Sequence, residues 1–358
     1  KLFALGAALF AGGLIAGSFA TALWQLYLWY GLVASLGTTI LGLSNYAALL
    51  SRWFRKQRGL ALGIAFAGTG AGTFLVIPLT ERAISAWGWQ WAMIGQGVLL
   101  LGVVLPLSLF FLRLRPADMG LAPDGEPMVA SPAPLPAGDS KPSWTLKAAR
   151  STWAFWLILV SGWGALFSLR MLTVHQVAVA VDAGIDRFIA AAVMGGSGIV
   201  TVIAFIGWGA ISDRLGRRRT FVLSSATLAL AFVILLAVKS AQDLPLLYLY
   251  ALMLGLGEGS RSSLIAAVVN DTFPGEAGGQ ITGYVGMAFG AGAAMGSWSA
   301  GVIFDISGSY NDALWLGLAV TLLSAGCMAV VSWLARRGRL HLQFWFLNLP
   351  PPAGAGGD

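Results

Sequence analysis

The chain consists mainly of apolar segments that are each long enough to cross a lipid bilayer. A transmembrane helix needs about 20 mostly apolar residues. The mean hydropathy is +0.78 and only 10% of the residues are charged, whereas a soluble domain has about 25%. The sequence therefore predicts an all-α membrane protein with ten transmembrane helices, at residues 2–22, 24–49, 59–80, 90–112, 152–178, 187–211, 220–238, 245–268, 280–304 and 312–335.

The basic residues between these segments predict the orientation of the chain. If the spans alternate across the bilayer, 17 of the 22 lysines and arginines lie on one side and 3 on the other. Lysine and arginine accumulate in cytoplasmic loops, so both termini are expected in the cytoplasm, for a multi-pass protein of a bacterial inner (plasma) membrane. The net charge of +7 is spread over these short clusters rather than gathered in one domain, and no nucleic-acid partner is expected.

The spans fall into two groups on either side of a polar segment. Residues 115–144 are rich in proline, glycine and aspartate and have no periodicity, which is typical of a linker between helical bundles. The predicted organisation is an N-terminal bundle of four spans (1–114), a cytoplasmic linker (115–150), a C-terminal bundle of six spans (151–339) and a cytoplasmic tail (340–358).

Two glycine triplets with the same internal spacing indicate that the bundles are duplicated. Gly59, Gly68 and Gly72 recur as Gly283, Gly292 and Gly296. Internal repeats are common in secondary transporters, although coincidence is the alternative in a chain with 47 glycines. If the two triplets are equivalent, the first bundle lacks two spans of a plan of six plus six. Because the chain opens at Lys1, at the edge of a span and without a methionine, we expect an N-terminally incomplete sequence.

The loop after residue 207, GWGAISDRLGRRRT, is the most specific motif. It resembles the loop motif of the major facilitator superfamily, and the resemblance implies that superfamily's fold of two bundles and twelve helices. In the family this loop forms a charge latch between the bundles, which makes it a gating loop. The matching residues are Gly209, Asp213, Arg214, Gly216, Arg217, Arg218 and Arg219.

Two further segments resemble one branch of that superfamily. Residues 51–72, SRWFRKQRGLALGIAFAGTGAG, and 299–315, SAGVIFDISGSYNDALW, are similar to monocarboxylate transporters and oxalate/formate exchangers. That branch carries small organic anions with protons or in exchange. Residues 188–210 lack the Asp and Arg that the branch commonly places in this span, and residues 279–301 lack the lysine of some exchangers. The substrate's identity is therefore not carried over.

Four ionisable residues lie inside predicted spans and are the candidates for substrate binding or proton coupling. They are Arg170, His175, Glu258 and Arg261. A charge at the centre of a membrane helix costs about 2.5 to 3.5 kcal/mol, so such residues face the bundle interior or a wet cavity. Glu258 and Arg261, three positions apart, would share one helix face. They form either a structural pair or part of the substrate path, and His175 alternatively occupies a polar vestibule.

The chemistry of these residues fits a proton-linked anion carrier. Arginine binds carboxylates through its planar fork, histidine titrates near neutral pH, and a glutamate of raised pKa can carry a proton. By the resemblance, the helices of Arg170 and Glu258 line the central cavity. The sequence thus predicts a secondary transporter of a small, monocarboxylate-like anion, working by alternating access with the proton as coupling ion.

The remaining expectations concern partners and alternatives. With two histidines and no matching carboxylate pair, the chain is not expected to be an enzyme or to hold a metal or cofactor. The expected partners are a small-molecule substrate, protons and the lipid bilayer, and the protein is expected to be monomeric. The alternatives are a non-transporting sensor or receptor on the same fold and an inactive truncated remnant.

Overall fold

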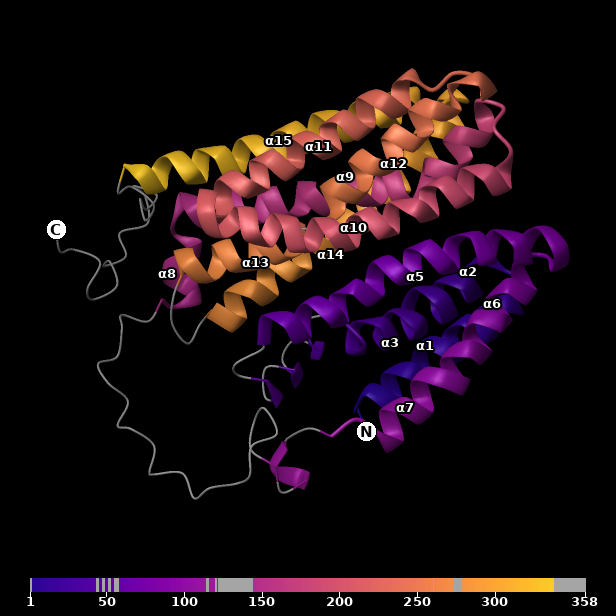
Figure 1. Ribbon diagram of the computed structural model, residues 1–358, viewed down its shortest axis with the longest axis horizontal. Helices are drawn as coiled ribbons and strands as arrows, with labels where there is room; N and C mark the ends of the chain where they lie inside the picture. Colours follow the sequence, from indigo (N-terminus) through magenta and orange to yellow (C-terminus); the bar gives the residue numbers. More distant parts are fainter. Residues whose placement is uncertain are drawn as a thin grey trace. The chain divides into compact units, whose positions relative to one another are not determined.

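The computed structural model describes residues 2–42, 45–46, 49–50, 53–54, 58–113, 116–119, 121, 144–259, 261–273 and 278–337. All regular elements in these ranges are helices, as Figure 1 shows. The chain forms two compact units, residues 1–133 and 134–358. The boundary lies within the segment predicted as a linker, while the predicted tail, 340–358, lies outside the described residues.

Seven helices among the described residues are long and apolar enough to cross a membrane. One belongs to the N-terminal unit and six belong to the C-terminal unit; the helix Leu2–Ser18 is also apolar but shorter. The predicted fold class, an all-α membrane protein, is confirmed. The seven spans are Trp89–Phe110, Trp153–Asp182, Arg187–Leu215, Arg217–Ala237, Ala241–Thr272, Gly279–Ser307 and Asn311–Arg336.

The N-terminal unit contains short helical pieces that continue one another. From residue 23 to residue 40 an α-helix widens into a π-helical stretch and narrows again, and the same happens from residue 89 to residue 110. The elements are α1 (Leu2–Ser18), α2 (Leu23–Leu26), η1 (Tyr27–Ala34), α3 (Ser35–Ile40), α5 (Arg58–Trp87), α6 (Trp89–Leu99), η2 (Leu100–Val104), α7 (Leu105–Phe110) and η3 (Pro116–Met119).

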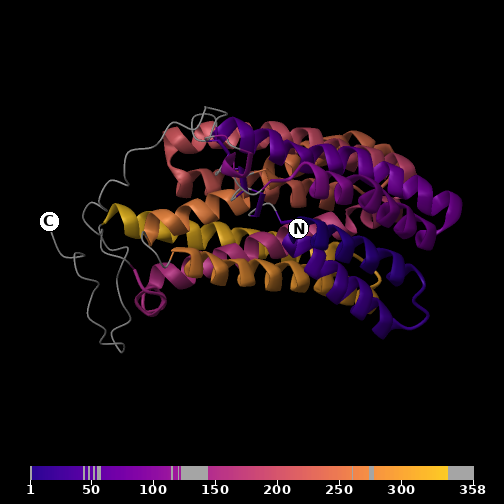
Figure 2. The same cartoon turned by 90° about the horizontal axis from the view of Figure 1, so that it is seen from below.

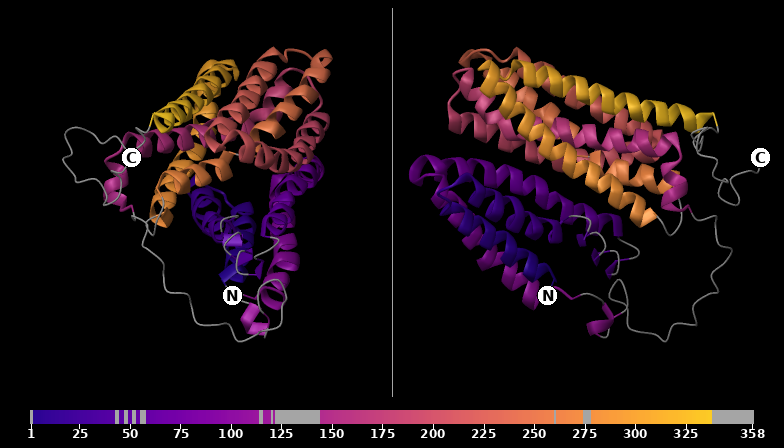
Figure 3. Two further views of the ribbon diagram at one scale, coloured as in Figure 1. Left: turned by 60° about the vertical axis from the view of Figure 1, so that its left-hand side comes forward. Right: turned by 180° about the vertical axis from the view of Figure 1, so that it is seen from behind.

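The C-terminal unit is a bundle of long helices that run side by side, as the three views show (Figures 1, 2 and 3). α9 packs on α14 and α15, α11 packs on α12 and α15, and α10 packs on α12. The elements are α8 (Leu146–Arg150), α9 (Trp153–Asp182), α10 (Arg187–Leu215), α11 (Arg217–Ala237), η5 (Ala241–Asp243), α12 (Leu244–Glu258), α13 (Arg261–Thr272), α14 (Gly278–Ser307) and α15 (Asn311–Arg336).

Side chains that accept backbone N–H groups fix where two of these helices begin. The Thr152 hydroxyl accepts from the N–H of Phe155 at the start of α9, and the Asp186 carboxylate accepts from Ile189 at the start of α10. Such caps satisfy donors that have no partner inside the helix. The capping residues Thr152 and Asp186 therefore determine where α9 and α10 begin.

Within the segment predicted as one span at 245–268, the structure describes α12 and α13, and residue 260 between them lies outside the described residues. α12 ends at Glu258, Gly259 forms a turn, and α13 begins at Arg261. Glu258 and Arg261 are consequently the last residue of one helix and the first of the next. The predicted shared helix face of Glu258 and Arg261 stays a prediction, because it depends on residue 260.

Candidate functional site

Three glycines at the end of α12 let this helix approach its neighbours closely. A Cβ atom at Gly255 would lie 2.6 Å from the Ser197 carbonyl oxygen of α10, and one at Gly259 would lie 2.7 Å from the Cβ of Ala204. Gly257 faces α11, where an added Cβ would lie 2.9 Å from the Cβ of Leu228. Small residues four apart allow such backbone contact between membrane helices. The contact places Glu258 beside α10.

Glu258 lies between a hydroxyl group and a guanidinium group that come from two other helices. Its carboxyl group is within hydrogen-bonding reach of the Thr201 side chain of α10, and the positive charge of Arg170 from α9 acts on it. Glu258 is partly buried, whereas Arg170 is exposed on the C-terminal unit. Arg170 and Glu258 are thus close enough for their charges to interact, although no ion pair joins them among the described residues.

Thr201 can satisfy both protonation states of Glu258. Its hydroxyl also donates to the Ser197 carbonyl over 3.0 Å, and a hydroxyl group has one proton to donate and two lone pairs to accept with. When Glu258 is ionised, Thr201 can turn its proton to the carboxylate. When Glu258 is protonated, Thr201 can accept from it and donate to Ser197 instead.

Arg261 is buried among backbone carbonyl groups and an aromatic ring. Its side chain is 1% exposed. The Nε atom donates to the Gly257 carbonyl and Nη1 donates to the Ala165 carbonyl of α9, each over 3.2 Å, while the guanidinium carbon lies 5.6 Å from the centre of the Phe221 ring. Among the described residues no ion pair joins Arg261 to Glu258. These contacts connect the start of α13 to α9, α11 and the end of α12.

His175 connects α9 to α14 and to the turn before α15. Its Nε2 atom lies 2.9 Å from the Ser297 carbonyl oxygen and its Nδ1 atom lies 3.4 Å from the Tyr310 hydroxyl. Because a carbonyl can only accept, Nε2 carries the proton, and in the neutral imidazole Nδ1 accepts from Tyr310. Burial, with the charges of Asp182 and Asp305, raises the pKa of the Tyr310 phenol, which keeps this donor protonated.

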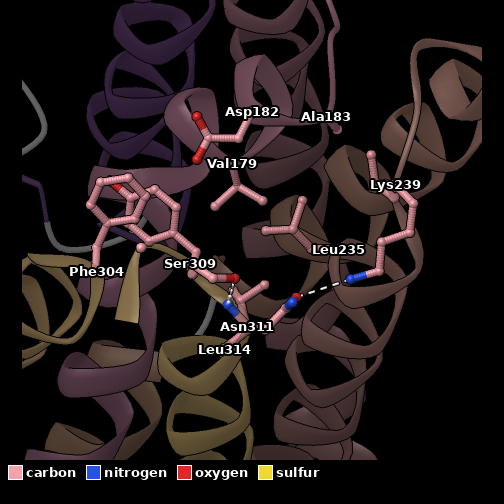
Figure 4. A pocket seen from close by; sticks show the side chains of 12 residues that line it. Val179, Asp182, Ala183, Leu235, Lys239, Phe304, Ser309, Asn311 and Leu314 are labelled. Atoms are coloured by element: carbon pink, nitrogen blue, oxygen red, sulfur yellow. Dashed lines mark hydrogen bonds between the residues drawn. The ribbon is translucent and has the colours of Figure 1, made fainter. Parts of the chain in front are cut away.

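A cavity of about 340 Å³ opens above His175, between the ends of α9, α11 and α14 and the start of α15. Figure 4 shows its apolar floor, formed by Val179, Leu235 and Leu314, and two opposite charges, Asp182 and Lys239, at its sides. The Lys239 ammonium group donates to the Asn311 side chain over 3.0 Å. Tyr310 lines this cavity and contacts His175, so a polar vestibule borders the histidine.

The residues of the predicted gating loop differ in whether they contact α13. Asp213, Arg214 and Arg219 are exposed. Arg217 forms an ion pair with Asp271, and Arg218 donates to the Thr272 hydroxyl over 3.2 Å. Gly216, at φ +85°, turns the chain between α10 and α11, a backbone conformation that glycine adopts without strain. Gly209 has open space where a Cβ would stand.

Several neighbours of the candidate residues were not predicted from the sequence. Thr201 belongs to a hydrophobic span and has no distinguishing pattern. Asp271 carries a usable signal, because it is an acidic residue in the loop 269–279, which alternation of the spans places on the same side as the basic clusters. Among the described residues, no group of three or more His, Cys, Asp or Glu side chains could hold a metal ion.

Comparison with known proteins agrees with this architecture. The sequence profile of the Major Facilitator Superfamily matches residues 1–179 and 164–347. Monocarboxylate transporter 12 of Rattus norvegicus is 26% identical over 332 residues, which are 87% of this chain and 67% of that protein. Monocarboxylate transporter 11 of Mus musculus is 30% identical over 322 residues, which are 86% of this chain and 66% of that protein. The chain thus spans about two thirds of these relatives.

The solved structures that resemble this chain have the same fold. A bacterial homologue of the human lysosomal transporter Spinster, in an inward-facing and unoccupied conformation, aligns with a TM-score of 0.60 and 14% identity over 96% of this chain and 84% of that chain. The same homologue in an occupied conformation aligns with a TM-score of 0.59.

The apolar helices and the family match define a multi-pass membrane protein of the transporter class. The chain belongs to the major facilitator superfamily, and it is similar to the monocarboxylate transporters. This membership supports the transport of small solutes, and the similar proteins are transporters.

Proposed function

We propose that this chain moves a small organic anion of the monocarboxylate type across the membrane by alternating access, together with a proton. The observation that supports the proposal is that the positive charge of Arg170 on α9 acts on the Glu258 carboxyl group at the end of α12, both in the C-terminal unit. An arginine binds a carboxylate through two parallel hydrogen bonds, and a neighbouring carboxyl group can hold the proton. The names of the similar transporters support the same substrate class.

In this proposal Arg170 and Glu258 couple the anion to the proton. When Glu258 is ionised, its carboxylate attracts the Arg170 guanidinium and competes with a substrate carboxylate for it. Protonation of Glu258 removes that competitor and leaves Arg170 available to the substrate. The anion and the proton therefore bind together, and we expect the affinity for the anion to rise as the pH falls.

The other candidate residues have supporting roles. Arg261 holds the junction of α12 and α13, which fixes the position of Glu258, and His175 borders the vestibule from which solutes or protons approach. The loop that contains Asp213 favours the state that is closed toward the cytoplasm. We further propose that both termini are cytoplasmic, that the membrane is a bacterial inner membrane and that the protein works as a monomer.

Uptake into proteoliposomes tests the proposal. The complete reading frame would be reconstituted, and uptake of radiolabelled lactate and pyruvate would be measured with the outside at pH 5.5 and the inside at pH 7.5, beside a labelled sugar and an organic cation. We expect uptake of the monocarboxylates only, driven by the proton gradient and recorded also as acidification by a pH dye inside.

The matched variants are Arg170→Gln and Arg337→Gln. Both remove one positive charge, but Arg337 stacks on the Trp333 ring at the end of α15, with its guanidinium carbon 4.4 Å from the ring centre. We expect uptake at low substrate concentration to fall strongly in the first variant and to be kept in the second. Uptake of sugars or cations alone, or equal carboxylate uptake in both variants, would show the proposal to be wrong.

A further inference from the structure

A second cavity, of about 370 Å³, lies at the end of the C-terminal unit that the charge distribution predicts to be cytoplasmic. It is bounded by the start of α11 and the ends of α13 and α15. Most of its polar lining consists of arginine side chains. The lining residues are Leu215, Gly216, Arg217, Arg218, Arg219, Asp271, Ser332, Ala335 and Arg336.

The charges around this cavity do not balance. Of the lining residues, four are arginines and one is an aspartate, so the lining carries an excess of three positive charges. Asp271 is already paired with Arg217. Arg219 and Arg336 form no ion pair with any other residue that the structure describes. Like charges in one cavity repel each other, and an anion between them would remove that repulsion.

The backbone and one buried nitrogen atom add further donors. α11 begins at Arg217 after Gly216, and no side chain caps its first N–H groups. The N-terminus of a long helix favours an anion through these free N–H groups and its dipole. The Nε atom of Arg218 is buried and has no hydrogen-bond partner. The unpaired donors and the excess charge at this cavity thus favour the same kind of ligand.

We propose that this cavity is a binding site for a phosphoryl group. Several guanidinium forks around one cavity match the oxygen atoms of a phosphate better than the two oxygens of a single carboxylate. The cavity also has an apolar wall, because it is lined by Leu215, which is 46% exposed. A phospholipid headgroup would place its phosphate among the arginines and its glycerol on that wall; a soluble phosphate compound would use the arginines alone.

An occupant would connect the ends of three helices. Arg217 and Arg218 bind the last turn of α13 through Asp271 and Thr272, and Arg336 is the last residue of α15. A phosphoryl group shared by Arg219 and Arg336 would join α11 to α15 as the ion pair joins α11 to α13. The site involves none of the residues proposed to bind the transported anion, and its test does not depend on transport.

Lipid and phosphate titrations of the purified full-length protein in dodecyl maltoside test this site. Phosphatidylglycerol, phosphatidylcholine and pyrophosphate would be added separately, and thermal unfolding and the number of bound lipids in native mass spectra would be recorded. We expect phosphatidylglycerol to raise the melting temperature by several degrees and phosphatidylcholine to have little effect. A response to pyrophosphate without a response to phosphatidylglycerol would identify a soluble phosphate compound as the source.

The decisive comparison is between two double variants of equal charge. Arg219→Gln with Arg336→Gln removes two cavity arginines, whereas Arg214→Gln with Arg337→Gln removes two nearby arginines that do not line the cavity. We expect the affinity for the phosphoryl ligand to fall at least tenfold in the first and to change less than twofold in the second. Arg219→Lys with Arg336→Lys keeps the charge and is expected to retain part of the affinity. This variant keeps the proposal testable if the glutamine variant does not fold.

Two results would overturn the site. An equal loss in both double variants would mean that the ligand responds to overall charge rather than to the cavity. The absence of any response to phosphatidylglycerol and to pyrophosphate in the wild-type protein would mean that the cavity binds no phosphoryl group. Neither result bears on the transport of monocarboxylates, so the two proposals fail independently.

Discussion

The Nη1 group of Arg261 donates a hydrogen bond to the backbone carbonyl of Ala165 over 3.2 Å, and this bond joins the first residue of α13 to the middle of α9. The same guanidinium binds the Gly257 carbonyl near the end of α12. One buried side chain thus holds both sides of the junction at which α12 ends. This position explains why a charge is found there without a carboxylate partner among the described residues.

Arg261→Gln is expected to destabilise the protein rather than to change its substrate affinity. A hydrogen bond from a charged group contributes about 1.5 to 3 kcal/mol, and the carbonyl groups left behind are buried. The melting temperature should therefore fall by several degrees, while the KM for the transported anion, measured in the protein that remains folded, stays within about twofold. An unchanged melting temperature with a raised KM would instead place Arg261 in the substrate site.

Arg170→Gln is expected to weaken substrate binding while leaving the stability of the protein nearly unchanged. Arg170 is exposed on the C-terminal unit, so its loss should alter the melting temperature little. Its proposed contact with the substrate carboxylate is charge-assisted, and we expect KM to rise at least tenfold, which corresponds to about 1.4 kcal/mol. Arg170→Lys should give an intermediate KM because it keeps the charge but not the fork. Equal KM values in all three proteins would contradict the assignment.

Glu258→Gln is expected to abolish the dependence of transport on pH. The amide cannot release a proton and cannot compete as an anion for Arg170, so the variant resembles the protonated carrier at every pH. We expect counterflow of labelled lactate to persist and to become nearly independent of pH between 5.5 and 8, while uptake driven by a proton gradient is lost. The measurement is counterflow and gradient-driven uptake in the same vesicles. A variant that keeps the wild-type pH profile would exclude Glu258 as the proton carrier.

The sequence was sufficient to predict an all-α membrane protein of this superfamily, but not which residues of different helices contact one another. Apolar length and the positions of the arginines carry most of the information about membrane spans, because the bilayer imposes both. The close approach of Gly259 to α10 was not predicted, since it depends on how two distant segments pack rather than on local sequence. The carbonyl partner of Arg261 on α9 is set by packing between segments far apart in the chain, which periodicity does not specify.

The two glycine triplets also show that spacing in the sequence does not specify which neighbours a residue contacts. Gly292 and Gly296 of α14 touch the backbone of α9, whereas Gly68 and Gly72 of α5 have open space where a Cβ would stand. Equal spacing in the sequence thus corresponds to different surroundings among the described residues. The predicted duplication of the two bundles stays a prediction.

Gly296→Ala is expected to disrupt the packing of α14 on α9. An added Cβ would lie 2.1 Å from the carbonyl oxygen of Phe167, which is backbone and cannot turn aside. We expect a loss of at least about 2 kcal/mol in stability, comparable to overpacking in a core. Gly290→Ala on the same helix is the control, because nothing lies within 4 Å of its added Cβ; it should be neutral or stabilising by up to about 1 kcal/mol. Thermal unfolding in detergent measures both, and equal effects would argue against the close contact.

His175 and Tyr310 are expected to stabilise the protein as a pair. The Tyr310 hydroxyl donates to Nδ1 of the neutral imidazole over 3.4 Å, while Nε2 donates to Ser297. Removing either side chain partner should cost about 0.5 to 1.5 kcal/mol. In a double-mutant cycle with His175→Ala and Tyr310→Phe at pH 8, the losses should be less than additive, because the second change removes a bond that the first has already broken. Additive losses in unfolding experiments would mean that the two side chains do not interact. In that case Tyr310 would not connect the vestibule to His175.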